Sequence, residues 1–379
     1  MEQVEVRLLQ PGEYPAAVAL SDVTFRDVSQ KSMGSAFPAI FSPALSQCFG
    51  TFVDGKLAAF MGLVPSVVHV GPSRLMVYSL GSVCTHPNYQ GKGYASMLLA
   101  QVQNFIRQAN AALLLVSGER SLYTRANCFA FGQVSEITLE ADSDAITAAE
   151  TDIVIRELES RDWLTVHALA SGRAVRYEQG VWEMATLVES EAHASCVHLR
   201  HKALVAERDG ELVAFAILAL PERENQPGLA VEWGGDAQGV AAICRFATAT
   251  SGLARLVAHV PWHEADLIEQ LTQGPHQSKQ AHNQGTLYVT DVSLLLTQMK
   301  AYLAEKDPVL SAQLAVETDE QGAYHLTLGT EKVVLGAEDL ISFFFNPTWE
   351  ATKASDEMGR LRQKLFPLPF PYTAGLNYV

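Results

Sequence analysis

The sequence predicts an α+β protein made of two similar domains and a smaller third one. Apolar runs typical of strands alternate with runs of helical periodicity along all 379 residues. The segment DGKLAAF at 54–60 recurs as DGELVAF at 209–215, and the offset matches a whole domain. A chain of this length also exceeds one ordinary domain. We therefore expect mixed sheets flanked by helices in domains at 1–142, 150–285 and 286–379.

The first domain contains a strand, a glycine loop and a helix in direct succession. The apolar run at 77–83 is typical of a buried strand, a turn follows at 86–88, and helical spacing continues from 94 to 106. Gly91 and Gly93 lack a Cβ, so the main chain can curl tightly and a phosphate can approach it. The amides and the positive dipole end at the helix start also favour an anion. This pattern predicts a phosphate-binding loop, and the alternative is an ordinary strand–helix turn.

Spacing excludes two common phosphate loops. A Walker loop needs Ser or Thr after Gly-Lys, but Gly93 follows Lys92, and Ser96 stands where a dinucleotide loop needs its third glycine. The segment VCTHPNYQGKGYAS at 83–96 instead resembles the acetyl-CoA motif of the GNAT acetyltransferases, Val-x-Val/Thr followed by Gln/Arg-x-x-Gly-x-Gly/Ala. The resemblance implies that acetyl-CoA binds at this motif and at the end of the next strand. The residues concerned are Val83, Cys84, Thr85, Gln90, Gly91, Lys92, Gly93, Tyr94, Ala95, Ser96, Gly118 and Glu119.

A second GNAT-like pattern follows at the distance usual in that family. The apolar run at 113–116 predicts the next strand, and Tyr123 and Phe129 then resemble the family's Tyr-x-x-x-Gly-Phe. Cys128 stands where the family has glycine. The resemblance implies that Tyr123 protonates the departing sulfur, since a phenol pKa near 10 is close to that of a thiol. The alternative is a tyrosine that only packs against its neighbours.

The second domain repeats the order of the first without its phosphate loop. Strand-like runs at 153–155, 229–233 and 256–260 and a helical run at 241–249 echo the first copy. No Gly-x-Gly opens this helix, and Asp236 places a negative charge where a pyrophosphate would lie. We expect no CoA site here, and therefore no effect of an aspartate at position 239 on acetyl-CoA binding. The polar stretch at 265–285 is expected to be a loop or a frayed helix.

The third segment has the pattern of a small α+β unit. Asp291 is a plausible cap for a helix at 292–303, and alternating runs with turns predict strands further on. This segment resembles the sterol carrier protein-like domain that ends the Eis class of acetyltransferases, whose order is GNAT, degenerate GNAT, sterol carrier-like domain. The expected strands lie at 313–317, 324–328 and 332–335, and the expected short helices at 337–345 and 348–354.

The last residues predict a docked, extended tail. Three prolines within 366–372, FPLPFPY, exclude a helix, and the segment is too apolar to remain loose. In the Eis class and in the similarly tandem N-myristoyltransferases the C-terminal carboxylate enters the active site. The resemblance therefore implies that the Val379 carboxylate accepts the proton of the substrate amine. The alternative is a tail that merely packs on the surface.

Charge and composition restrict the partners. The formal net charge is −15 and is spread as −1 over 1–142, −9 over 143–285 and −5 over 286–379. Without a basic run, nucleic-acid binding is disfavoured. An acidic surface favours a cationic substrate, although it can equally serve solubility.

Location and metal content are also predicted from the sequence. No apolar run reaches the roughly 18 residues of a membrane helix, and the start lacks a signal-peptide layout, so no membrane partner is expected. Five scattered cysteines in apolar settings suggest reduced core thiols of a cytoplasmic protein. No Cys/His spacing suggests zinc, and we expect no metal.

These observations lead to two functional hypotheses. The first is an N-acetyltransferase that moves an acetyl group from acetyl-CoA to a primary amine, such as an aminoglycoside, a polyamine-like molecule or a protein lysine, in a ternary complex. The second is a non-catalytic acyl-CoA-binding or regulatory protein on the same fold. The phosphate loop and Tyr123 favour the enzyme. Eis-class proteins often form symmetric assemblies, so the resemblance also makes a homo-oligomer plausible.

Overall fold

The chain folds into two compact units that do not follow the expected three-domain order. The computed structural model describes residues 2–140, 152–222, 226–251, 253–350 and 354–379. The first unit contains residues 1–132, 283–370 and 379, and the second contains 133–282 and 371–378. Most of the segment expected as a third domain, 286–379, therefore belongs to the first unit.

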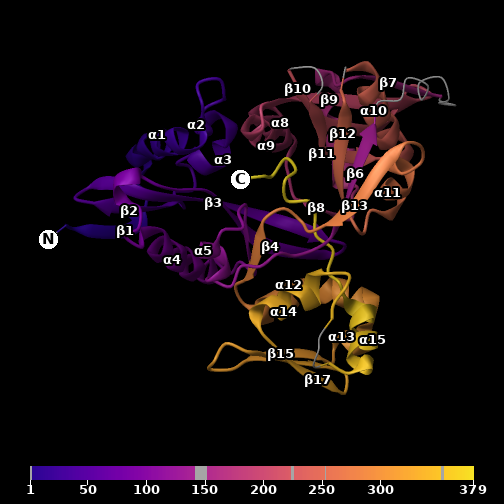
Figure 1. Ribbon diagram of the computed structural model, residues 1–379. Helices are drawn as coiled ribbons and strands as arrows, with labels where there is room; N and C mark the ends of the chain where they lie inside the picture. The colour runs from indigo at the N-terminus through magenta and orange to yellow at the C-terminus, as the bar shows by residue number, and fades with distance from the viewer. Residues whose placement is uncertain (1, 141–151, 223–225, 252, 351–353) are drawn as a thin grey trace. The chain divides into compact units, whose positions relative to one another are not determined.

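A mixed sheet organises the first unit. Its strands are ordered β1-β2-β3-β4-β5-β14, and β4 and β5 are parallel while the other neighbours are antiparallel. Helices α1–α3 cover one face and α4 and α5 the other (Figure 1). The elements up to β14 are β1 Val4–Leu8, η1 Pro11–Glu13, α1 Tyr14–Phe25, α2 Met33–Ala36, α3 Pro38–Phe41, β2 Phe49–Val53, β3 Lys56–Val70, β4 Ser73–Thr85, η2 Pro87–Tyr89, α4 Tyr94–Gln108, β5 Leu113–Val116, α5 Ser121–Thr124 and β14 Thr286–Val289.

The second unit repeats this topology. Its sheet is ordered β7-β9-β10-β11-β12-β6-β13, with β11 and β12 parallel and α10 between them in sequence, as α4 lies between β4 and β5. The elements are β6 Val134–Glu140, β7 Ile153–Glu157, η3 Ser160–Asp162, α7 Trp163–Ser171, β8 Val175–Tyr177, α8 Val181–Ser190, α9 Ala192–Cys196, β9 Leu199–Arg208, β10 Glu211–Pro221, β11 Pro227–Gly235, α10 Ala237–Thr250, β12 Arg255–Pro261, α11 Ala265–Leu271 and β13 His276–Ala281.

The two repeated Asp-Gly pairs form equivalent hairpin turns. Asp54 and Gly55 have φ angles of 47° and 78°, and Asp209 and Gly210 have 53° and 80°. Positive φ at both central residues is what a two-residue hairpin turn requires, and Asp-Gly supplies it with little strain. The hairpins join β2 to β3 and β9 to β10, as the sequence repeat predicts.

An exchange of strands explains why the expected domain boundaries differ from the structure. β6 follows the first half of the chain in sequence but pairs antiparallel with β12 in the second sheet. β14 returns to pair antiparallel with β5 in the first sheet. The expected end of the first domain at residue 142 therefore lies too late, because the strand just before it, β6, already belongs to the second unit.

The prediction of a loop or frayed helix at 265–285 is wrong for the part that forms a strand, and the prediction of a helix at 348–354, of which 351–353 lie outside the described residues, is wrong for 348–350. The first stretch contains α11 and β13, and β13 is polar and exposed on both faces, so its pairing with β6 was invisible to hydrophobic patterning. The described residues at 348–350 are not helical, and the helix lies later, at α15, Asp356–Leu365. Ser355 caps it by accepting a hydrogen bond from the Met358 N–H at 3.0 Å.

Burial agrees with most of the predicted core positions. Helix α4 buries Leu98, Val102 and Ile106 against the sheet, whereas Met97 is exposed. Four of the five cysteines are buried thiols, but Cys196 is exposed, contrary to the expectation of a core position. Among the helices that the structure describes, none is long and apolar enough to cross a membrane.

The remainder of the first unit is a small three-stranded sheet with helices. The predicted cap is confirmed, because the Asp291 carboxylate accepts a hydrogen bond from the Leu294 N–H at 3.0 Å. The strands are ordered β15-β16-β17. The elements are α12 Val292–Lys306, α13 Pro308–Ser311, β15 Leu314–Thr318, β16 Tyr324–Leu328, β17 Glu331–Leu335, α14 Ala337–Phe345 and α15.

A buried arginine from α15 holds the end of α14. The Arg362 side chain donates to the carbonyl oxygens of Phe343 at 2.9 Å, Ser342 at 3.3 Å and Asn346. Its guanidinium also lies 5.5 Å from the centroid of the Phe343 ring. Burial lowers the pKa of Arg362 to about 10, so it remains charged at neutral pH. Arg362 thus satisfies carbonyls that a helix end leaves without partners.

Replacing Arg362 with methionine should therefore destabilise the first unit. Arg362→Met removes the donors and leaves buried carbonyls unsatisfied, which should cost about 2–3 kcal/mol of unfolding free energy. Arg360→Met is the matched control, since Arg360 is exposed and only pairs with Glu357 within the same helix. Equal midpoints of the two variants in urea denaturation would contradict the role assigned to Arg362.

Candidate active site

The first sheet opens where its two parallel strands stop pairing. β5 follows β4 only from Val77 to Leu80, opposite Leu113 to Val116. The Ser117 N–H then donates to the Leu80 carbonyl at 3.2 Å. β4 continues to Thr85 along β3, so its last residues present one backbone edge that β5 does not cover. Such an edge can bind an extended ligand through main-chain hydrogen bonds.

A bulge in β4 lies at this opening. The register with β3 shifts between the pairs Gly62↔Gly81 and Phe60↔Cys84, so one residue of β3 faces two of β4. Ser82 has a φ of 52°, unusual for a residue with a side chain. The bulge therefore turns the end of β4 at the point where β5 leaves it.

Backbone alternation identifies which N–H groups face the opening. The His86 N–H donates to the Ala58 carbonyl of β3 at 2.9 Å. Successive N–H groups of a strand point to opposite edges, so the Cys84 N–H also points to β3, and those of Val83 and Thr85 point away from it. The thiol of Cys84 lies 3.6 Å from the Ser21 hydroxyl in a buried position. Of the three predicted strand residues, Val83 and Thr85 thus face the opening and Cys84 does not.

The glycine loop continues directly from this strand. Gly91 and Gly93 have φ angles of 76° and 81°, and a Cβ on either would meet nothing within 4 Å. Gly93 caps α4, and the N–H groups of Ser96 and Met97 both donate to its carbonyl at 3.1 Å. The preceding amides of Tyr94 and Ala95 are the ones that a helix start leaves without intrahelical partners. The loop is therefore an open anion cradle with a helix dipole behind it.

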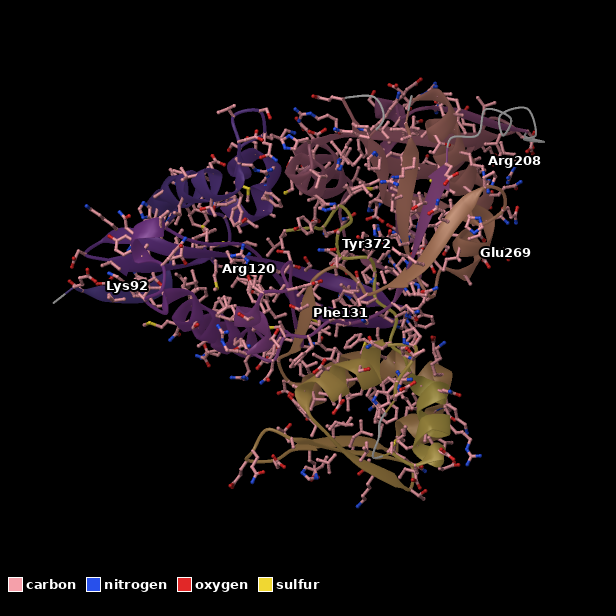
Figure 2. The ribbon with its side chains drawn as sticks, in the orientation of Figure 1. Lys92, Arg120, Phe131, Arg208, Glu269 and Tyr372 are labelled. Carbon is pink, nitrogen blue, oxygen red and sulfur yellow. The ribbon has the colours of Figure 1, made fainter. Side chains whose placement is uncertain are left out.

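Among the other predicted loop residues, Gln90, Lys92 and Ser96 lie on the surface, whereas Tyr94 is buried and Ala95 is half-buried. The Gln90 amide donates to the Thr85 carbonyl at 3.3 Å and ties the loop to the end of β4. Lys92, labelled in Figure 2, lies 3.2 Å from a carboxylate oxygen of Glu2, and this pair is exposed. Its ammonium can therefore exchange Glu2 for another anion at little cost.

The equivalent helix start in the second unit is already occupied by a carboxylate. Asp236 accepts a hydrogen bond from the Gly239 N–H at 3.3 Å and lies 3.0 Å from the Arg208 guanidinium. A phosphate would meet a like charge there. Gly239 itself is buried, and a Cβ on it would lie 2.7 Å from that of Ala214, so an aspartate at 239 would disturb packing and is not a suitable control for acetyl-CoA binding.

Tyr123 lies beyond the carboxyl end of β5, on α5. Its side chain is 5 % exposed, and its carbonyl accepts a hydrogen bond from the Cys128 N–H at 3.0 Å. Burial raises the pKa of Tyr123 to about 12, so the phenol keeps its proton at neutral pH. Gly118 lies against the tyrosine ring, and its carbonyl accepts a hydrogen bond from the Thr286 hydroxyl at 3.1 Å. Glu119 is exposed.

The end of the chain reaches the bulge of β4. The tail is docked as predicted: Phe366, Leu368 and Phe370 are each at most 4 % exposed. The Phe370 ring packs edge-on against Phe131, with centroids 5.6 Å apart (Phe131 is labelled in Figure 2). Val379 lies so close to Gly81 that a Cβ on this glycine would be 2.6 Å from the Val379 carbonyl oxygen. The structure thus brings the terminal carboxylate beside the strand that carries Val83 and Thr85.

Sequence reasoning missed Gly81 and Ser82, although both stand in the predicted strand. A glycine followed by a serine inside an apolar run is a weak bulge signal, and it was the only one available. No metal site emerges: among the described residues no group of three or more His, Cys, Asp or Glu side chains could hold an ion.

Comparison with known proteins agrees with this geometry. Residues 5–130 match the family described as acetyltransferase (GNAT) domain. No curated protein matches the sequence. Among solved structures, the fold resembles a GCN5-related N-acetyltransferase from Anabaena variabilis, with a TM-score of 0.60 at 10% identity over 90% of both chains.

Two further structures share the fold at similarly low identity. A GCN5-related N-acetyltransferase from Kribbella flavida has a TM-score of 0.59 at 12% identity over 90% of this chain and 88% of the other. Eis1 from Mycobacterium abscessus has a TM-score of 0.59 at 11% identity over 90% and 89%. Residues 5–130 thus form a GNAT acetyltransferase domain, which makes the protein an acyltransferase.

The open glycine loop predicts the effect of a charge placed in it. Gly93→Asp adds a carboxylate at the anion cradle and should abolish acetyl-CoA binding in calorimetry, because like charges repel. The matched control is Gly210→Asp in the second unit, where φ is 80° and a Cβ also meets nothing within 4 Å. Both variants carry the same backbone strain and charge. Retained binding by the folded Gly93→Asp protein would exclude this loop as the phosphate site.

Proposed function

We propose that the protein is an N-acetyltransferase that moves an acetyl group from acetyl-CoA to a primary amine in a ternary complex. The observation that carries this proposal is the position of the Val379 carboxylate at the β4 bulge, beside an uncovered strand edge that continues into an anion-binding loop. A proton acceptor therefore lies beside β4, a main-chain binding edge lies on β4, and a phosphate cradle follows directly after it. Together they suit acylation of an amine by acetyl-CoA, in which the amine loses a proton and the donor must be held in position.

The residues of β4 and its loop hold the donor. The outward N–H groups of Val83 and Thr85 suit the amide-containing arm of acetyl-CoA, as a neighbouring strand would. The cradle from Gln90 to Ala95 suits its pyrophosphate, and Lys92 adds a mobile positive charge. When bound, acetyl-CoA supplies the activated acyl carbon and a thiolate leaving group. The strand and loop fix its position relative to Val379.

The reaction needs two proton transfers, one from the amine to a base and one from an acid to the sulfur, and we assign the base to the Val379 carboxylate and the acid to the Tyr123 phenol. An alkylamine has a pKa of about 10.4 and must lose a proton before it can attack, and the Val379 carboxylate accepts it directly or through water. Burial raises the pKa of Tyr123 to about 12, so the phenol keeps its proton and remains available to the departing sulfur, although this shift makes it a weaker acid than a free phenol. An N–H of the uncovered strand edge stabilises the oxygen that becomes negative during transfer.

The whole chain fits the Eis class in this proposal. The second sheet repeats the order and directions of the first, which supports tandem GNAT domains, and Asp236 leaves the second copy without a phosphate site. The small unit from α12 to α15 corresponds to the sterol carrier-like domain. The net charge of −15 supports a cationic amine as the acceptor. A panel of aminoglycosides, polyamines and lysine peptides, with release of CoA as the signal, tests the activity and identifies the acceptor.

Tyr123→Phe separates catalysis from binding. The change keeps the ring and removes the acidic proton, so kcat should fall by about 10²–10⁴-fold while the affinity for acetyl-CoA changes little. Because the pKa of Tyr123 is raised to about 12, kcat of the unmodified enzyme should not decline between pH 7 and 10 through loss of this proton. An unchanged kcat in Tyr123→Phe would leave the residue as packing only.

Changes at the chain end test the base. Leu376 is buried, and Asn377 accepts a hydrogen bond from the Gln179 side chain, so deleting several residues would also remove anchors of the tail. Deleting Val379 alone moves the carboxylate back by about 3.3–3.6 Å and keeps those contacts. This deletion, and equally a C-terminal tag, should lower kcat strongly.

Tag position provides the control for this prediction. The same tag at the N-terminus should leave amine acetylation unchanged, and all these variants should still bind acetyl-CoA. If the C-terminally tagged enzyme works at the normal rate, the base is elsewhere, and Glu119, His86 or an ordered water would have to be considered.

A further inference from the structure

Two glycines stand where the parallel strands of the first sheet part. The last residues paired between β4 and β5 are Leu80 and Val116. Gly81 follows Leu80 directly, and Gly118 stands two residues beyond Val116. Each lies next to one of the two groups to which the proposed function assigns a proton transfer.

Gly81 leaves room for the end of the chain. A Cβ on this residue would lie 2.6 Å from the Val379 carbonyl oxygen, nearer still to its carboxyl carbon, and 3.3 Å from its Cα. These are main-chain atoms, which cannot rotate away as a flexible side chain would. Gly81 is not among the residues with positive φ, so its backbone conformation does not require glycine. The missing side chain therefore provides space for Val379.

Gly118 leaves room for the tyrosine ring in the same way. A Cβ on it would lie 2.9 Å from Cε2 of Tyr123 and 3.7 Å from Cδ2 and Cζ. Its φ is also outside the left-handed region. The Thr286 hydroxyl fixes the Gly118 carbonyl, and the Cys128 N–H fixes that of Tyr123. The Tyr123 ring is itself packed in the core of the first unit, with the residue only 5 % exposed, so it has little freedom to move away from an added methyl group.

We infer that Gly81 and Gly118 are positioning residues for the base and the acid. Gly81 sets how closely the Val379 carboxylate approaches the β4 bulge, and Gly118 sets the plane of the Tyr123 ring. This inference rests on the proposed function, which assigns the two proton transfers. It also gives Gly118 a role other than the cofactor contact expected from the family resemblance, because the space its missing side chain leaves is filled by Tyr123.

Two conservative substitutions test the inference. Gly81→Ala and Gly118→Ala should each lower kcat by about 10²-fold, the cost of a misplacement of about 1 Å, with little change in acetyl-CoA affinity. Gly359→Ala is the control, since it lies in the same unit and a Cβ there meets nothing within 4 Å. A normal kcat in both test variants would overturn the inference.

The pH profile distinguishes a displaced base from general damage. An amine with a pKa of about 10.4 is largely deprotonated above that pH and no longer needs a base. The rate deficit of Gly81→Ala should therefore shrink as the pH rises from 7 to 10. The deficit of Gly118→Ala should not shrink, because Tyr123 acts as an acid. Equal deficits at all pH values in Gly81→Ala would contradict its role.

Double variants separate this inference from the proposed function. If Gly81 acts only through the carboxylate, deleting Val379 in the Gly81→Ala enzyme should lower kcat no further than the deletion alone. Likewise, adding Gly118→Ala to the Tyr123→Phe enzyme should lower kcat no further than Tyr123→Phe alone. If kcat of a double variant falls by the product of the two single-variant decreases, the positioning roles are overturned. If deleting Val379 is harmless in the unmodified enzyme, the proposed base is wrong, whereas a harmful deletion with a normal Gly81→Ala refutes only the role of Gly81.

Discussion

The early end of pairing between β4 and β5 is the constraint on which the candidate site depends. Parallel strands normally use both backbone edges, but β5 accompanies β4 only as far as Leu80. The remaining residues of β4 keep their bonds to β3 and leave the opposite edge uncovered. The bulge at Ser82, the glycine loop, Tyr123 and the chain end all lie at or beyond this point. One change of strand pairing thus creates both the binding edge and the space for catalytic groups.

The second unit shows that the topology alone does not make a site. Its strands β7-β9-β10-β11-β12-β6 follow the order of the first sheet, with β13 added at the edge, and its parallel strands β11 and β12 are likewise joined by a helix, α10. There, Asp236 and its partner Arg208 fill the helix start. At the end of β11, a buried Arg173 is held by Glu232 and Glu264, and Glu264 also accepts a hydrogen bond from the Trp233 indole at 2.6 Å. Ion pairs in this unit therefore stand where the first unit keeps open amides.

Glycine has three different uses around the candidate site. At positions 91 and 93 it permits positive φ and an open backbone. At 81 and 118 the backbone is ordinary and the absent side chain makes room for another group. At 239 it allows α10 to pack against Ala214 in the second unit. These uses cannot be told apart by composition, because each depends on what faces the glycine.

The sequence by itself determined the features that depend on neighbouring residues. Hydrophobic periodicity located β4, α4 and β5, the Asp-Gly repeat identified the duplicated hairpins, and the glycine loop and Tyr123 carried the family resemblance. Only the tertiary structure decided that β6 and β14 change sheets, that Cys84 turns away from the opening, and that Gly81 accommodates Val379. The physical reason is that strand exchange, bulge geometry and docking of the tail are contacts between residues far apart in the chain. Such contacts leave no periodic pattern in the local sequence, whereas helices, hairpins and glycine loops do.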